Sequence, residues 1–185
     1  MVPPSVHTAG MCDICDGTTY EASWQRIQDL VASRSWAIQG VEAAAHQRPW
    51  AYTIGLTESF GHPELVITDG TWPTSVEILN MLGEWIRDGD EYDVGSVVDA
   101  GEFRIELGAV HASFLHHGLC ASWSAYYEWA GTDPGPLQVL QVMTTSRGTC
   151  EHQRARRADL AVPGAFSSPA GPNRAARRRA ARGRR

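Results

Sequence analysis

The sequence contains no lysine, and all 16 of its basic residues are arginine. It has no apolar run long enough to cross a bilayer, which excludes the class of proteins with membrane-spanning helices. The first ten residues lack a basic start followed by an apolar stretch, so no signal peptide is readable. Only four cysteines occur in 185 residues, and without a secretion signal we expect free thiols or metal ligands rather than structural disulfides. The absence of a membrane-spanning run therefore predicts a protein without membrane contact.

Several compact catalytic motifs are also missing. There is no HExxH pair for zinc, no glycine-rich loop for phosphate and no GxSxG elbow for a nucleophilic serine. The sequence therefore identifies no reaction, and any chemistry must come from smaller groups of residues.

Charge is distributed unevenly along the chain. Nine arginines against 21 acidic residues give residues 1–173 a formal charge of −12, and seven arginines in Arg174–Arg185 bring the total to −5. Four of the acidic residues form one loop, which contains Asp88, Asp90, Glu91 and Asp93. Phosphate is repelled by an acidic body, so we expect any polyanion contact to be made by Arg174–Arg185, weakly and without sequence preference. The alternative is that this tail only balances the charge of the body.

Hydrophobic periodicity predicts an α+β domain. Helical spacing and alternating spacing give, in chain order, a helix over about 19–34, strands over 36–41, 49–57 and 64–68, a helix over 73–88, a strand over 102–110, a helix over 113–130 and a strand over 137–144. The first two strands form an antiparallel hairpin, so we expect a mostly antiparallel sheet of about five strands with about three packed helices. Ala51, Thr53 and Gly55 make one face of the second strand small, and we expect a helix to pack closely there.

The domain boundaries follow from the loss of these patterns. We expect a disordered leader over residues 1–10, the folded domain over 11–150, a linker over 151–173 and a disordered basic C-terminal tail over 174–185. Because the leader has no pattern that could pack, Met11 is a second candidate for the initiator.

A longer string of residues resembles a known family. Residues 36–66 contain an aromatic-led strand ending in Gly-Val-Glu, then Pro-Trp-Ala-Tyr-Thr-Ile-Gly-Leu, then Gly-His-Pro-Glu-Leu, and residues 11–17 read MCDICDG. Over residues 11–145 the chain resembles the bacterial family named domain of unknown function 4262 (DUF4262). The resemblance implies a bacterial cytoplasmic protein and these domain limits. It implies no activity, and it transfers no catalytic residue.

The cysteines offer one candidate metal site. Cys12 and Cys15 have the CxxC spacing of a zinc knuckle, and Cys150 with His152 could complete a structural Cys3His zinc site. A redox dithiol is a second interpretation, and a pair of cysteines in a capping turn is a third. The irregular second half of the ligand set favours the third. Cys120 lies on an apolar helical pattern, which predicts a core residue.

A second candidate site surrounds the His-Pro-Glu turn. His62 and Glu64 lie near Tyr52 and Thr53 of the preceding strand, with Arg48 at the start of that strand. Such a group could perform acid–base chemistry or bind an anionic ligand. The alternative, which the sequence favours, is a rigid turn whose polar side chains satisfy backbone groups.

Two functional classes are compatible with these patterns. We expect a non-enzymatic binding or interaction domain. The alternative is a small hydrolase or ligand-transforming enzyme that uses Tyr52, His62 and Glu64. A pocket that gathers these side chains would favour the enzyme, and an exposed aromatic patch would favour the interaction module.

Overall fold

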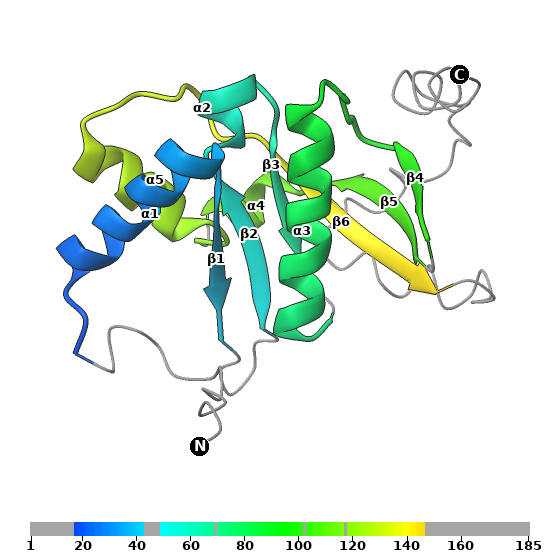
Figure 1. The fold of residues 1–185 in the computed structure, drawn as a ribbon, viewed down its shortest axis with the longest axis horizontal. Coiled ribbons are helices and arrows are strands. Elements are labelled where there is room, and N and C mark those ends of the chain that lie inside the picture. Colours follow the sequence, from blue (N-terminus) through cyan, green and yellow to red (C-terminus); the bar gives the residue numbers. More distant parts are fainter. Residues whose placement is uncertain (1–16, 43–48, 69, 102, 117, 147–185) are drawn as a thin grey trace, which may run out of the picture.

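The computed structural model describes residues 17–42, 49–68, 70–101, 103–116 and 118–146 (Figure 1). Its elements in chain order are α1 (Tyr20–Arg34), β1 (Ala37–Val41), β2 (Trp50–Ile54), α2 (Leu56–Phe60), β3 (Glu64–Ile67), α3 (Trp72–Arg87), β4 (Val97–Ala100), β5 (Phe103–Ala109), α4 (Ala112–His116), α5 (Ala121–Ala130) and β6 (Val139–Ser146). The expected leader, linker and basic tail lie outside the described residues. No helix in the described ranges is long and apolar enough to cross a membrane.

The strands form one mixed sheet in the order β1-β2-β3-β6-β5-β4. The predicted hairpin is present, with Ala37 of β1 opposite Ile54 of β2. β3 and β6 run parallel, with Leu65 beside Leu140, and every other pair is antiparallel. The α+β class and a mostly antiparallel sheet are therefore confirmed, since four of the five strand pairs are antiparallel. One detail differs: the sheet has six strands rather than about five. The additional strand is β4, which is too short for alternation to reveal.

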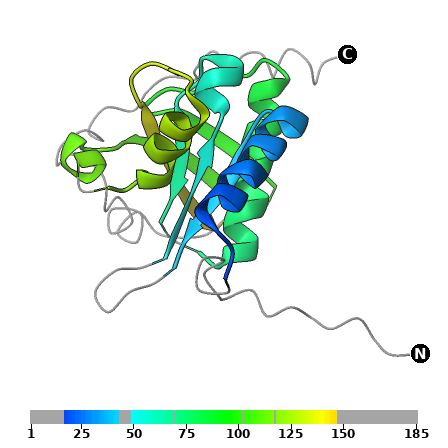
Figure 2. The same cartoon turned by 90° about the vertical axis from the view of Figure 1, so that its left-hand side faces the viewer.

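Helices cover both faces of the sheet, and Figure 2 shows α3 and α5 on opposite sides of the strands. α3 packs its apolar stripe of Ile78, Leu82 and Ile86 on the sheet. The other face is covered by α1 and α5, which contribute Ile27 and Trp123 to a second core cluster. The described chain has five helices rather than about three, because α2 is a separate single turn and the expected helix over 113–130 divides into α4 and α5.

The small face of β2 meets a helix, as expected. Ala51 is buried in the core cluster that contains the stripe of α3. Gly55 does not belong to that face, because β2 ends at Ile54 and Gly55 begins α2 with φ = 115°. A Cβ on Gly55 would lie 2.9 Å from the carbonyl oxygen of Ser35, just after α1. The close approach at Gly55 is therefore to the end of α1, not to α3.

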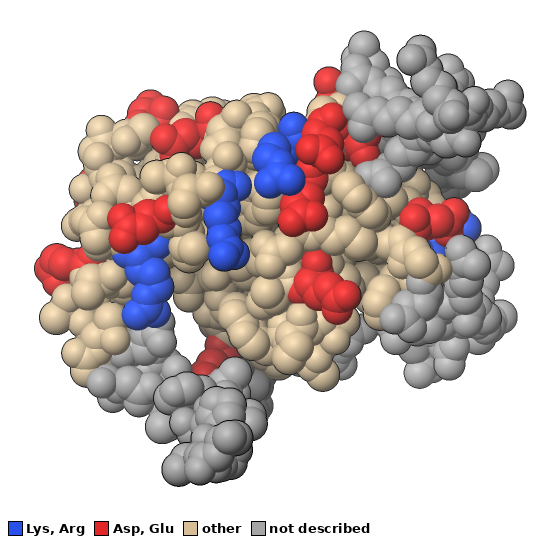
Figure 3. All heavy atoms as spheres, in the orientation of Figure 1, with Lys and Arg blue, Asp and Glu red and all other residues tan. Residues whose placement is uncertain are grey.

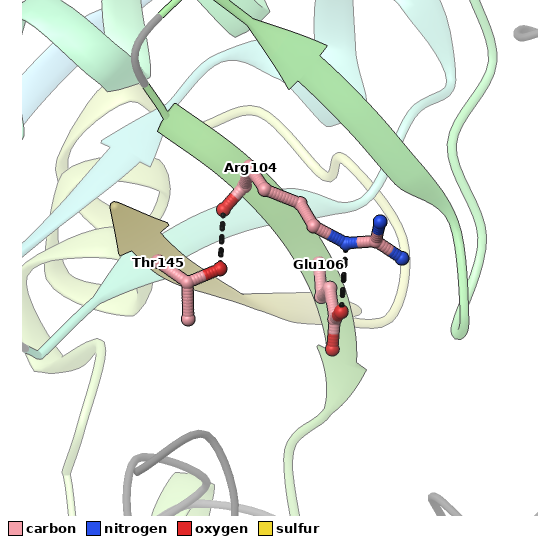
Figure 4. A network of polar contacts seen from close by, with 3 residues as sticks. All are labelled: Arg104, Glu106 and Thr145. Atoms are coloured by element: carbon pink, nitrogen blue, oxygen red, sulfur yellow. Dashed lines mark hydrogen bonds and ion pairs between the residues drawn. The ribbon is translucent and has the colours of Figure 1, made fainter. Parts of the chain in front are cut away.

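The far half of the sheet is held by a long pairing between β5 and β6. The Thr145 hydroxyl donates to the Arg104 carbonyl at 3.2 Å, and Arg104 Nε lies 3.2 Å from Glu106 Oε1 (Figure 4). This ion pair is partly exposed, so it adds at most about 1 kcal/mol to stability. The pairing therefore rests mainly on the backbone ladder, which joins Phe103 to Ser146 at one end and Ala109 to Leu140 at the other.

Candidate functional site

Glu64 is the most heavily hydrogen-bonded side chain of the candidate site. It begins β3, and none of its surface is exposed. Five groups donate hydrogen bonds to its carboxylate. Oε1 accepts from the backbone N–H of Gly55 at 3.0 Å, from that of Thr57 at 3.2 Å and from the indole N–H of Trp123 at 3.3 Å. Oε2 accepts from the hydroxyl of Thr53 at 2.6 Å and from the backbone N–H of Leu56 at 3.4 Å. Both oxygens are therefore engaged inside the protein.

The local fold explains why a carboxylate occupies this position. The first N–H groups of a helix have no partner within the helix and favour negative charge. Gly55, the N-cap of α2, has no side chain to accept these bonds, and Glu64 from the following strand takes its place. Thr53 links the two strands, since its hydroxyl also accepts a bond from the N–H of Leu65 at 2.9 Å. Glu64 therefore caps α2 and ties it to β2 and β3.

Burial also controls the acidity of this cluster. Removal from water raises the pKa of Glu64 above its usual 4.5, and the hydrogen bonds from Thr53, Thr57 and Gly55 oppose that rise. The Tyr52 hydroxyl accepts a bond from the N–H of Ser122 at 3.1 Å, and burial raises the pKa of Tyr52 to about 12. Tyr52 therefore stays protonated at neutral pH.

α5 supplies partners that the sequence did not indicate. The indole of Trp123 reaches Glu64 across 59 positions of sequence. The one available signal was chemical, because a buried tryptophan N–H requires an acceptor. Cys120 is buried, as expected for a core residue, and burial followed by the nearby charge of Glu64 raises the pKa of its thiol to about 12. A thiol with that pKa is a poor nucleophile at neutral pH.

His62 faces a different part of the molecule. Its Nδ1 lies 2.7 Å from the Pro63 carbonyl oxygen, and its Nε2 accepts a bond from the N–H of Tyr92 at 3.2 Å. This pair of contacts assigns the neutral ring with the proton on Nδ1. Burial lowers the pKa of His62 below 6.5, against the bond to Pro63 and the charges of Asp93 and Glu91.

The predicted site residues are thus divided between two surroundings. Tyr52 and Glu64 bond to α5, and Thr53 bonds to Glu64. His62 bonds to the loop after α3. Arg48 lies outside the described residues.

His62 also lines a hollow of about 450 Å³ between α2 and the end of α3. One side of the hollow is the turn that follows α2, which includes Phe60 and Pro63. The other side is the end of α3 and the acidic loop, with Arg87, Asp90, Glu91, Tyr92 and Asp93 among the lining residues. The hollow therefore places an apolar wall opposite charged groups.

The proposed zinc ligands Cys12, Cys15, Cys150 and His152 all lie outside the described residues. Within the ranges that the structure does describe, no group of three or more His, Cys, Asp or Glu side chains could hold a metal ion. The zinc site therefore stays a prediction.

Comparison with known proteins places the chain in a family. No curated protein and no solved structure matches it. The model of a domain of unknown function, DUF4262, matches residues 30–149. This range contains all six strands, Glu64 with its five donors, and the hollow beside His62. The resemblance carried by residues 36–66 is confirmed, and the protein belongs to the DUF4262 family.

Proposed function

We propose that this protein is a non-enzymatic binding domain whose ligand site is the hollow between α2 and the end of α3. One observation carries the proposal: Glu64, the strongest candidate for acid–base chemistry, has no exposed surface and accepts five internal hydrogen bonds. A substrate could reach its carboxylate only by breaking the cap of α2. The bacterial cytoplasmic setting is also part of this proposal and rests on the family resemblance.

Tyr52 and His62, the other two residues of the hydrolase alternative, also have hydrogen-bond partners inside the protein. The hydroxyl of Tyr52 bonds to Ser122, and both ring nitrogens of His62 lie against the backbone. These contacts support a structural role for all three side chains. The hollow, in contrast, contains exposed charged residues such as Glu91 and Asp93 that a ligand can reach.

The hollow is tested with ligands of either charge. Thermal unfolding of the full chain, and of a chain ending at Pro172, is followed with agmatine and with succinate as probes. We expect agmatine to raise the Tm of the chain ending at Pro172, and the rise to disappear in Glu91→Gln/Asp93→Asn but to persist in the control Glu77→Gln/Glu84→Gln. Equal shifts in both double variants would overturn the assignment of the hollow. Ester hydrolysis by the purified protein that is lost in Glu64→Gln would favour the enzyme instead.

A second contact is proposed for Arg174–Arg185. Its seven arginines would neutralise phosphates and release counterions, so binding to a polyanion should be weak and should fall steeply with salt. A single-stranded DNA oligonucleotide is titrated with the full chain and with the chain ending at Pro172. We expect only the full chain to bind at low salt. Equal binding by both, or binding by neither, would remove the polyanion contact.

A further inference from the structure

The hollow beside His62 has an excess of negative charge. Its described lining contains the carboxylates of Asp90, Glu91 and Asp93 and the guanidinium of Arg87. Arg87 also has other neighbours, since its Nε lies 3.8 Å from Asp88 and its guanidinium lies 6.0 Å from the centre of the Trp36 ring. Figure 3 shows acidic side chains gathered over the C-terminal end of α3. The field of the hollow therefore attracts a cation.

The residues that line the hollow indicate which kind of cation would bind there. Phe60 and Pro63 are half-buried and offer apolar surface across the hollow from the carboxylates. A guanidinium group is weakly hydrated, stacks on apolar and aromatic surfaces and bonds carboxylates with two parallel N–H groups. An ammonium group is compact and strongly hydrated, so it gains less from such a wall. Arginine side chains fit this mixture of apolar and acidic surface better than lysine does.

The chain contains its own source of arginines. Arg174–Arg185 has seven arginines and no acidic residue, and the last acidic residue before it is Asp159. Residues 147–173 separate this tail from the end of β6, and roughly 27 residues can span up to about 90 Å when extended. A domain of about 130 residues has a radius of gyration of only about 14 Å. Every surface of the domain is therefore within reach, and charge decides which surface is occupied.

We propose that the Arg174–Arg185 tail binds within its own chain to the acidic hollow between α2 and the end of α3. The proposal rests on the proposed binding function and names the ligand of that site as arginine side chains of this chain. It also implies regulation, because a polyanion and the hollow would compete for the same arginines. The tail contacts a polyanion only to the extent that it leaves the hollow.

The absence of lysine makes a direct test possible. In Arg178→Lys the new side chain is the single lysine, and a carbodiimide joins it as an amide to whichever carboxylate it touches. Trypsin cleaves after Arg87 and Arg104, so the acidic loop is recovered as residues 88–104 and fragmentation assigns the linked residue. Gln153→Lys is the control, because it places a lysine in the same full chain but outside the tail.

The expected result is a cross-link from position 178 to Glu91 or Asp93. Its yield should decrease as NaCl rises from about 50 mM to about 500 mM. The control Gln153→Lys should not give this cross-link. Cross-links spread equally over Glu77, Asp99 and the loop would overturn the proposal. Products joined between two chains would overturn the intramolecular contact. If the tail contact fails but agmatine still stabilises the chain ending at Pro172 through the hollow, the proposed binding function stands without it. If agmatine does not stabilise that chain, the binding function and the tail contact both fail.

Competition gives an independent readout. Release of the tail in Glu91→Gln/Asp93→Asn should tighten binding of the single-stranded DNA probe by about fivefold or more. The matched control is Glu77→Gln/Glu84→Gln, which removes the same two charges from the exposed side of α3. An equal change in both double variants would reflect net charge alone and would overturn the competition.

Discussion

Replacement of Glu64 by glutamine tests the central feature of the structure. The change keeps the size of the side chain but turns one acceptor oxygen into an NH2 group. If the NH2 group took the place of Oε1, it would face three N–H donors. In the place of Oε2 it would face only the N–H of Leu56 and the hydroxyl of Thr53, and the hydroxyl can rotate to accept a hydrogen bond. The amide should therefore point its nitrogen toward Thr53.

The cost of Glu64→Gln follows from that orientation. One buried N–H, that of Leu56, loses its acceptor, which costs about 1–3 kcal/mol. The three bonds to the other oxygen persist but lose their ionic character, which makes each of them weaker. The neutral amide also avoids the desolvation cost of the buried carboxylate, the largest cause of the raised pKa of Glu64, and this offsets part of the loss. We therefore expect the free energy of unfolding to fall by about 1–2 kcal/mol near pH 7.5. Urea denaturation followed by tryptophan fluorescence measures it, with the exposed Glu84→Gln as the control.

The same variant has a defined dependence on pH. Because burial raises the folded-state pKa of Glu64 above 4.5, the folded protein holds this proton more tightly than the unfolded chain does. The contribution of Glu64 to stability is therefore fully present below about pH 4.5 and is lost as pH rises through the folded pKa. The difference between wild type and Glu64→Gln should be larger near pH 5 than near pH 7.5. A difference below about 0.5 kcal/mol at both pH values, or one that shrinks on acidification, would refute this reasoning.

Three further changes have expected outcomes. Gly55→Val should lower the free energy of unfolding by roughly 2–4 kcal/mol, because the new side chain would clash with the Ser35 carbonyl and would also strain a backbone with φ = 115°. The control is Gly135→Val, which has φ = 84° and open space around it and should therefore show the cost of backbone strain alone. If the zinc site forms, elemental analysis should find about one zinc per chain, and Cys15→Ser should abolish it; metal-free native protein would end that hypothesis. Deletion of residues 1–10 should leave the Tm within about two degrees of the full chain, and a larger fall in a scanning calorimeter would show that these residues pack.

The sequence predicted the elements that carry their own hydrophobic pattern. The stripe of α3 repeats at three- and four-residue steps, and the hairpin alternates over two runs, so both were found with nearly the right bounds. β4 has four residues, and α2 is a single turn of five. Such short elements depend on their partners rather than on propensity, because one turn of helix is unstable alone. No local pattern could have revealed them.

The candidate site divides in the same way. The His-Pro-Glu turn is visible in the sequence, and its expected role of satisfying backbone groups agrees with the contacts of Glu64 and His62. The bond from Trp123 to Glu64 depends on how α5 crosses the sheet, which spacing along the chain does not encode. The hollow likewise joins the turn after α2 to the acidic loop after α3. The sequence predicted the acidic loop on one side of the hollow, but it did not indicate the apolar wall on the other side.

The two ends of the His-Pro-Glu turn should respond to acid in opposite directions. Burial lowers the pKa of His62 below 6.5, so the folded protein holds this proton less tightly than the unfolded chain. Its contribution is present above about pH 6.5 and is lost as pH falls through the folded pKa, because a proton on Nε2 would face the N–H of Tyr92. His62→Phe keeps a ring against Tyr92 and removes the titration.

The difference in unfolding free energy between wild type and His62→Phe should be about 1–3 kcal/mol near pH 7.5, the cost of leaving the N–H of Tyr92 without its acceptor. It should shrink between pH 7.5 and pH 5, over the range in which the Glu64→Gln difference grows. Urea titrations of the three proteins at both pH values measure the two slopes side by side. Because Glu64 and His62 are separated only by Pro63, a general effect of pH on this turn would move both differences together. Slopes of the same sign would therefore refute the assignment of a raised pKa to one group and a lowered pKa to the other.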